Sequence, residues 1–268
     1  MFAQITILVK SHLRAIVRDR VLAAVVGVAL AMIMLVPALS SFSMRQVQEL
    51  AITLSLSAIS GMLLIITLLL GASSIWRDVE RRYTTSILTL PISRGVFLLS
   101  KFFSIVLFLL LCTIVLGLAS AVVIILAAAS YPSDLPILWN NIVLALAGDF
   151  FKYLLLAGVA VLLSAVSTSF YLPFFATLAI FFCGSASQEV YEYVSGELGH
   201  GLHPLSAKAV TLSYYLLPNF AAFDFQVQAV YGLPVPLSGF LLAVVYALIY
   251  TAILVGLAMF AFGRRELS

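Results

Sequence analysis

Two charged side chains lie close together in an otherwise apolar stretch of the chain. Asp149 and Lys152 are three residues apart, so a helix places them next to each other on one face. A carboxylate and an ammonium at this spacing can form an ion pair. Charged groups in so apolar a setting are costly unless they pair or serve a function.

A second group of residues has the chemistry of metal ligands. Glu197, His200 and His203 carry oxygen and nitrogen donors within a short stretch. However, glycines flank His200, no helical scaffold is indicated, and no cysteine or further histidine completes a ligand set. Cys112 and Cys183 lie in apolar runs, where they behave as small hydrophobic residues. We therefore predict no metal site, and an acidic, solvated loop around the two histidines.

The elements that position these residues are predicted to be membrane-spanning helices. Hydrophobic residues make up 63% of the 268 positions and charged residues 9%, which is typical of an integral membrane protein. The runs are apolar on all sides, unlike the alternating pattern of membrane strands. We predict an all-α membrane protein with a single domain, residues 1–268. Runs long enough to cross a bilayer lie at 21–40, 51–75, 102–129, 142–167, 170–187 and 237–262.

The basic residues predict the orientation of these spans. Most of the 14 Lys and Arg residues fall in segments on one side if the N-terminus is cytoplasmic, as the positive-inside rule requires. We therefore expect a multi-pass protein of the cytoplasmic (inner) membrane with both termini in the cytoplasm. The net charge of +3 is explained by this topology, and it gives no reason to expect a nucleic-acid partner.

This topology also suggests where the charged pair lies. Residues 153–166 form an uninterrupted apolar run that ends on the cytoplasmic side. Asp149 and Lys152 are therefore expected near the outer interface, where Lys152 can extend toward water. A structural ion pair and a contact at an outer gate both fit the pattern.

Residues 1–20 are predicted to form an amphipathic elbow helix at the membrane surface. Lys10, Arg14 and Arg18 recur at four-residue spacing beside the apolar face. Such a helix lies in the interface and is attracted to anionic lipid. An ordinary basic flank that only enforces orientation is the alternative. The apolar face consists of Phe2, Ile5, Val9, Leu13 and Ile16.

The connection at residues 76–95 gathers much of the charge of the protein. Thr84 or Thr85 can cap a short helix, and Pro91 ends it. Apolar side chains surrounded by arginines in the cytosol indicate a docking site for another protein. A re-entrant or surface-lying loop with topology-setting arginines remains the other interpretation.

Residues 78–102, DVERRYTTSILTLPISRGVFLLSKF, resemble the signature loop of the type-2 ABC transporter permeases. The family shows an acidic residue, Gly-Thr, a Leu-Leu pair, Pro-(Val/Ile)-Ser-Arg and a Lys that opens the third span. Tyr83 departs from this pattern because it occupies the usual glycine position. The matching positions are Glu80, Thr84, Ile87, Leu88, Pro91, Ile92, Ser93, Arg94 and Lys101.

The resemblance implies a half-transporter. Two permease subunits, identical or related, would form the membrane part, and two ABC ATPase subunits would dock on its cytoplasmic loops. ATP and Mg would be bound by the ATPase, and the chain itself contains no G-x-x-x-x-G-K-[ST] motif. The chain is thus expected to be neither an enzyme nor a cofactor-binding protein. The implied docking and coupling residues are Arg77, Glu80, Arg81, Arg82, Thr84, Ile87, Leu88, Leu90, Pro91 and Arg94.

Residues 188–236 form the outer segment before the last span. Leu205–Leu217 is too short to span a bilayer, so it is predicted to be an interfacial or re-entrant helix that Pro218 ends. Tyr214–Phe225, YYLLPNFAAFDF, is similar to this segment in the branch that contains the nitrous-oxide-reductase maturation permeases.

The predicted function is ATP-driven export or flipping of a substrate. A path at the subunit interface would be lined by apolar and hydroxyl residues, which favours an amphipathic cargo. A non-transporting scaffold or assembly subunit is the alternative. Small residues at four-residue spacing, Ala23, Gly27 and Ala31, then Ser57 and Gly61, allow close helix packing, more often within one subunit than between two. The hydroxyl residues of the path are Ser55, Ser57, Ser60 and Thr67.

Overall fold

The computed structural model describes residues 2–41, 46–80, 93–130, 136–196 and 204–264. Within these ranges the protein is helical and contains no strand. Six helices are long and apolar enough to cross a membrane, and they coincide with the six predicted runs. They are α2 (Arg20–Ser40), α3 (Val47–Glu80), α5 (Arg94–Ser130), α6 (Trp139–Val166), α7 (Tyr171–Ser195) and α10 (Leu237–Arg264).

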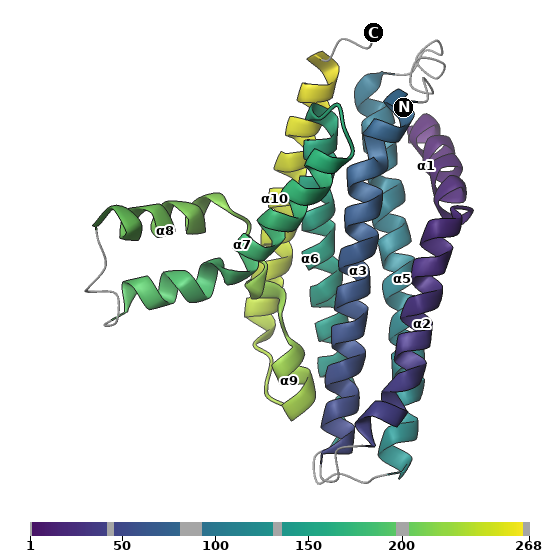
Figure 1. The fold of residues 1–268 in the computed structure, drawn as a ribbon, viewed down its shortest axis with the longest axis vertical. Coiled ribbons are helices and arrows are strands. Elements are labelled where there is room, and N and C mark those ends of the chain that lie inside the picture. The colour runs from purple at the N-terminus through teal and green to yellow at the C-terminus, as the bar shows by residue number, and fades with distance from the viewer. Residues whose placement is uncertain (1, 42–45, 81–92, 131–135, 197–203, 265–268) are drawn as a thin grey trace.

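Helices α3 and α5 are longer than a bilayer requires. They contain 34 and 37 residues, or roughly 50 and 55 Å at 1.5 Å per residue, against a hydrocarbon core of about 30 Å. The end of α3 and the beginning of α5 lie at the same end of the bundle as α1 and the last turn of α10 (Figure 1). We call this the terminal end, because both chain termini lie there.

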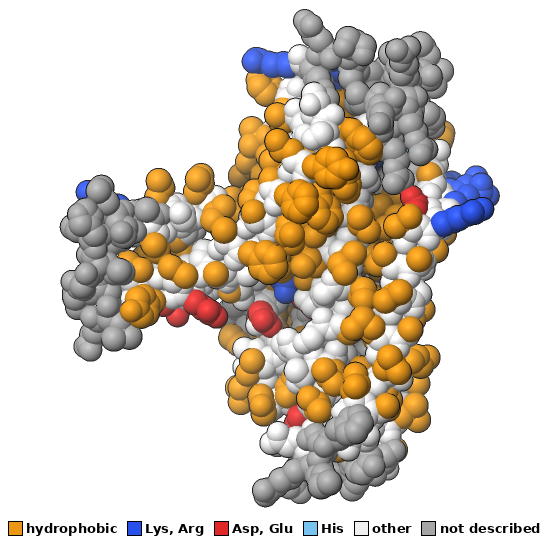
Figure 2. All heavy atoms as spheres, viewed as in Figure 1, with side chains coloured by type: hydrophobic (Ala, Val, Ile, Leu, Met, Phe, Trp, Pro, Cys, Tyr) orange, Lys and Arg blue, Asp and Glu red, His pale blue; other side chains and the backbone are white. Residues whose placement is uncertain are grey.

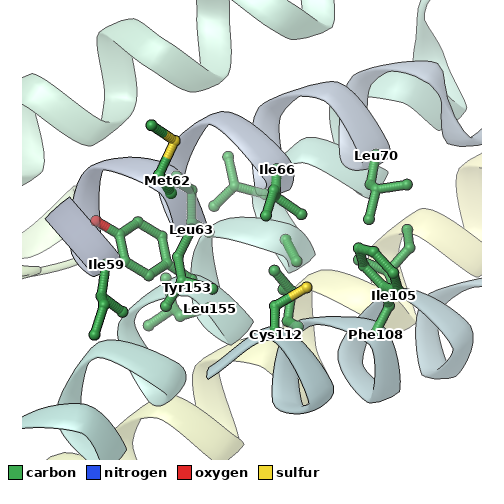
Figure 3. Close-up of a cluster of buried hydrophobic side chains, with 14 of the residues drawn as sticks. Ile59, Met62, Leu63, Ile66, Leu70, Ile105, Phe108, Cys112, Tyr153 and Leu155 are labelled. Atoms are coloured by element: carbon green, nitrogen blue, oxygen red, sulfur yellow. The ribbon is translucent and has the colours of Figure 1, made fainter. Parts of the chain in front are cut away.

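Helix α6 is the central element of the bundle. It packs against α3, α5, α7 and α10, and every residue from Lys152 to Val161 is buried. Figure 3 shows part of the core at the α3–α5–α6 contact, where Ile59 and Leu63 lie near Tyr153, and Phe108 lies beside Ile105. The outward faces of the other spans carry large exposed apolar side chains, as expected for helices in contact with lipid.

The N-terminal helix α1 (Phe2–Val17) has the two predicted faces. Lys10, Arg14 and Arg18 are exposed, and the described apolar residues at Ile5, Val9, Leu13 and Ile16 are half-buried. This face packs against α5, where the Ser104 hydroxyl donates to the Val9 carbonyl at 3.2 Å. Asp19 then caps α2, because its Oδ1 accepts from the Val21 amide at 2.9 Å. The helix and its two faces agree with the prediction for residues 1–20, and a position at the membrane surface stays a prediction.

The later part of α7 and helix α8 (Pro204–Leu216) form an arm that projects sideways from the bundle (Figure 1). The ring of Tyr191 on α7 stacks on Tyr214 of α8 with their centroids 4.3 Å apart. A helix was predicted at Leu205–Leu217, and α8 confirms it within one residue at each end.

After the arm, residues 217–231 return to the bundle, and we call them the returning segment. It contains a 3-10 turn (Ala221–Phe223) and the short helix α9 (Gln226–Tyr231). Two glycines permit its close approach: a Cβ at Gly184 of α7 would collide with the Pro218 carbonyl oxygen, and one at Gly148 of α6 would lie 2.6 Å from the Phe223 oxygen. The returning segment is thus packed directly onto α6 and α7.

Candidate functional site

Asp149 and Lys152 form a buried ion pair near the middle of α6. Nζ of Lys152 lies 3.0 Å from Oδ1 of Asp149, and the two residues are only 9% and 8% exposed. Their placement on one helical face is therefore confirmed. The expectation that Lys152 extends to water is wrong, because the side chain is buried and its ammonium donates to Ser60 at 3.3 Å.

Ser60 of α3 connects the ion pair to a second helix. Its hydroxyl donates to Oδ1 of Asp149 at 3.0 Å and lies 2.8 Å from the Tyr153 hydroxyl. A serine hydroxyl has one proton to donate. Because that proton goes to Asp149, the Tyr153 hydroxyl donates to Ser60. The Ser60 hydroxyl thus accepts hydrogen bonds from Lys152 and Tyr153 and donates one to the Asp149 carboxylate.

A cavity of about 270 Å³ adjoins this cluster. It lies among α3, α6, α7 and the returning segment, and Figure 2 shows acidic and basic side chains close together in a hollow where the arm leaves the bundle. Its lining combines polar side chains, among them Ser57, Ser60, Asp149 and Lys152, with four aromatic ones. The aromatic residues are Tyr153, Phe181, Phe223 and Phe225.

The returning segment contributes a third charge to the cavity. Asp224 is exposed and lines it, and its Oδ1 accepts from the Gln226 amide at 3.0 Å. The side-chain amide of Gln226 donates to the Ser57 hydroxyl at 2.8 Å and to the Thr53 carbonyl at 3.1 Å. The segment that covers the cavity is therefore hydrogen-bonded to α3.

The four hydroxyl residues proposed for a substrate path do not lie together. Ser57 and Ser60 line the cavity. Ser55 and Thr67 are fully buried elsewhere on α3, and their hydroxyl oxygens have no hydrogen-bond partner among the described atoms. The structure therefore brings two of the four to the ion pair.

Most of the proposed docking residues lie outside the described residues. These are Arg81, Arg82, Thr84, Ile87, Leu88, Leu90 and Pro91. Arg77 and Glu80 belong to the last turns of α3, and Arg94 begins α5. The Arg94 guanidinium donates to the Gly263 carbonyl of α10 at 3.2 Å, so α5 and α10 are joined at the terminal end.

Glu197, His200 and His203, for which no metal site is predicted, also lie outside the described residues. In the part of the chain that the structure covers, no three His, Cys, Asp or Glu side chains come together as a metal site would require.

His12 is a buried polar residue that the sequence interpretation missed. It lies in α1 beside a second cavity of about 470 Å³ among α1, α2, α3 and α5, and its ring meets Phe97 edge-on at 5.5 Å. Burial, and then the positive charge of Lys101, lower the pKa of His12 from 6.5 to about 4. The sequence could have indicated that His12 is buried, because position 12 follows Ile5 by two helical turns and lies on the same apolar face.

Among the described residues, no helix packs closely against the two stripes of small residues at Gly27 and Gly61. Ala23, Gly27 and Ala31 are exposed on α2, as are Ser57 and Gly61 on α3. A Cβ added at Gly27 or Gly61 would meet no atom within 4 Å. The expectation of packing within one subunit is therefore wrong for both stripes.

No family model and no curated protein matches this chain. The membrane-spanning helices, the buried ion pair and its cavity are therefore the observations from which a function can be inferred.

Proposed function

We propose that the chain is the membrane-spanning permease subunit of an ATP-driven ABC exporter. A separate ATPase subunit hydrolyses ATP, and the permease exports or flips a substrate across a cytoplasmic membrane. The observation that carries this proposal is the position of Ser60. The same helix, α3, leads to the connection with the permease-like sequence and also holds the hydroxyl that binds the Asp149–Lys152 pair.

Helix α3 is suited to transmit a displacement from the ATPase to this site. It is continuous from Val47 to Glu80, so Ser60 lies about 30 Å along the helix from Glu80 at 1.5 Å per residue. Because an α-helix keeps its backbone hydrogen bonds when it moves as a body, a push at Glu80 displaces Ser60 relative to α6. The hydrogen bonds of Ser60 would then break or rearrange.

The orientation follows from the basic residues. Lys10, Arg14 and Arg18 are exposed on α1 at the terminal end, where α3 ends and α5 begins. Placing this end in the cytoplasm satisfies the positive-inside rule. The connection between α3 and α5 would then face the compartment that contains ATP.

A second permease subunit would complete the transporter. The exposed small residues of α2 and α3 leave room for the backbone of another helix to approach. The stripe on α3 includes Ser57 and Gly61, which also line the cavity. A partner subunit against this stripe would therefore lie beside the cavity.

The test is a charge placed in the proposed docking helix. Leu88→Asp, in the native host membrane, is expected to abolish co-purification of vanadate-sensitive ATPase activity while membrane insertion stays intact. Leu233→Asp is the matched control, because Leu233 is exposed between α9 and α10, near the opposite end. ATPase activity that co-purifies equally with wild type and Leu88→Asp would overturn the docking role. Absence of any ATPase from the wild-type complex would favour the scaffold alternative.

A further inference from the structure

The cavity beside the ion pair has the size of a small organic group. Its volume of about 270 Å³ lies just below the usual range of about 300–1,000 Å³ for ligand pockets. It is bounded by three helices and the returning segment, so a bound group would contact all four elements. A whole drug-sized molecule would not fit, but the head of an amphipathic molecule would.

The charges that line this cavity do not cancel. Lys152 neutralises Asp149, with which it forms the ion pair. The carboxylate of Asp224 then remains as an excess negative charge at the cavity. Two carboxylates face one ammonium, so the cavity attracts a cation and repels an anion.

Asp149 retains an unused acceptor. Both of its hydrogen bonds, from Lys152 and from Ser60, go to Oδ1. Among the described residues no hydrogen bond to Oδ2 is formed, and this oxygen is not fully enclosed. Because Asp149 lines the cavity, a positively charged group there can bind this carboxylate oxygen.

The aromatic lining of the cavity suits a cation that carries carbon substituents. The ring of Tyr153 lies against Phe181, with centroids 6.2 Å apart, and Phe223 and Phe225 also line the cavity. Aromatic faces attract cations, and they pack well against the methyl or methylene groups of a substituted ammonium. A bare metal ion would gain little from these rings and would need further oxygen ligands.

We propose that this cavity binds the substituted ammonium group of an organic cation, with Asp224 and Asp149 providing the charge and the aromatic rings the walls. The proposal rests on the exporter function given above, because it names the class of substrate that the permease would carry. The binding site itself depends only on this chain.

The test compares choline with its uncharged isostere 3,3-dimethyl-1-butanol, in which a carbon replaces the quaternary nitrogen. Binding of radiolabelled choline is measured on the purified full-length protein in lipid nanodiscs, without an ATPase or ATP. Saturable binding is expected, with competition by unlabelled choline and none by the isostere. Equal competition by the two compounds, or no saturable choline binding, would overturn the proposal.

Two variants and a control locate the site. Asp224→Asn keeps the acceptor for the Gln226 amide but removes the charge, and it is expected to weaken choline binding about tenfold. Phe225→Leu keeps an apolar side chain but removes the ring, and it is also expected to weaken binding. Glu189→Gln removes an exposed carboxylate of α7 that does not line the cavity, and it should bind as wild type does. An unchanged affinity for Asp224→Asn, or an equal loss for Glu189→Gln, would contradict the assignment.

This experiment separates the two proposals. Choline binding by the isolated chain, together with no ATPase co-purifying with the wild-type protein, would leave the cation site standing and reject the exporter. ATPase association without choline binding would reject the cation site alone.

Discussion

The ammonium of Lys152 lies 3.0 Å from Oδ1 of Asp149, and Ser60 of α3 hydrogen-bonds to both groups. The ion pair is formed within α6, but Ser60 makes it a contact between two helices. In a buried environment such a contact depends on every member, because each group that loses its partner keeps its desolvation cost.

Removing one charge of the pair should destabilise the protein more than removing both. Asp149→Asn leaves the Lys152 ammonium buried without its counter-ion, and a cost of about 3 kcal/mol is expected. The double variant Asp149→Leu/Lys152→Met should lose less, since neither charge is then buried alone. Thermal unfolding of the detergent-solubilised variants measures the difference. A double variant less stable than Asp149→Asn would show that the pair itself contributes net stability.

Ser60→Ala should weaken the contact between α3 and α6. The hydroxyl makes hydrogen bonds with three side chains, and their loss is expected to cost about 2 kcal/mol. Ser120→Ala is the control, because the Ser120 hydroxyl bonds only to the Gly117 carbonyl of its own helix. Hydrogen exchange of α3 and α6 amides should increase in Ser60→Ala and not in Ser120→Ala. Equal behaviour of the two variants would count against the interhelical role.

Gly148→Ala should displace the returning segment from α6. The added Cβ would lie 2.6 Å from the Phe223 carbonyl oxygen and 2.8 Å from the Phe225 ring, so the backbone must shift. We expect a loss of about 1–3 kcal/mol in stability and faster proteolysis within residues 217–231. Gly256→Ala on α10 is the matched change, because its Cβ would meet nothing within 4 Å. If the returning segment is protected from protease equally in Gly148→Ala and Gly256→Ala, this close contact is ruled out.

Acid should loosen the packing of α1 through His12. Its pKa is lowered from 6.5 to about 4 in the folded protein, so the unfolded state binds the proton first as pH falls. Stability is therefore at its full value above about pH 6.5, decreases as pH falls toward about 4 and is constant below that. The total loss is about 3 kcal/mol at 1.36 kcal/mol per pH unit.

His12→Phe isolates this contribution, because it keeps a ring beside Phe97 and Lys101 but removes the titrating group. The difference in α1 hydrogen exchange between pH 7 and pH 4.5 should be smaller in the variant than in wild type. An identical pH response in both proteins would assign the effect to other groups.

Properties that depend on local sequence were predictable. The six spans, α8 and the two faces of α1 follow from hydropathy and helical periodicity, which a helix expresses without information from distant residues. The adjacency of Asp149 and Lys152 follows from the same geometry. His12 shares the face of Ile5 and could have been recognised as buried by the same argument.

Only the tertiary structure decided what these residues contact. Lys152 was expected to reach water, but Ser60, 92 positions earlier, provides a buried partner. The cavity exists because the returning segment packs onto Gly148 and Gly184 and brings Asp224 to the ion pair. Local periodicity determines which face of a helix is polar or apolar. Which side chains meet across helices depends on how the bundle packs. The packing in turn depends on many long-range contacts of similar energy, which local periodicity does not specify.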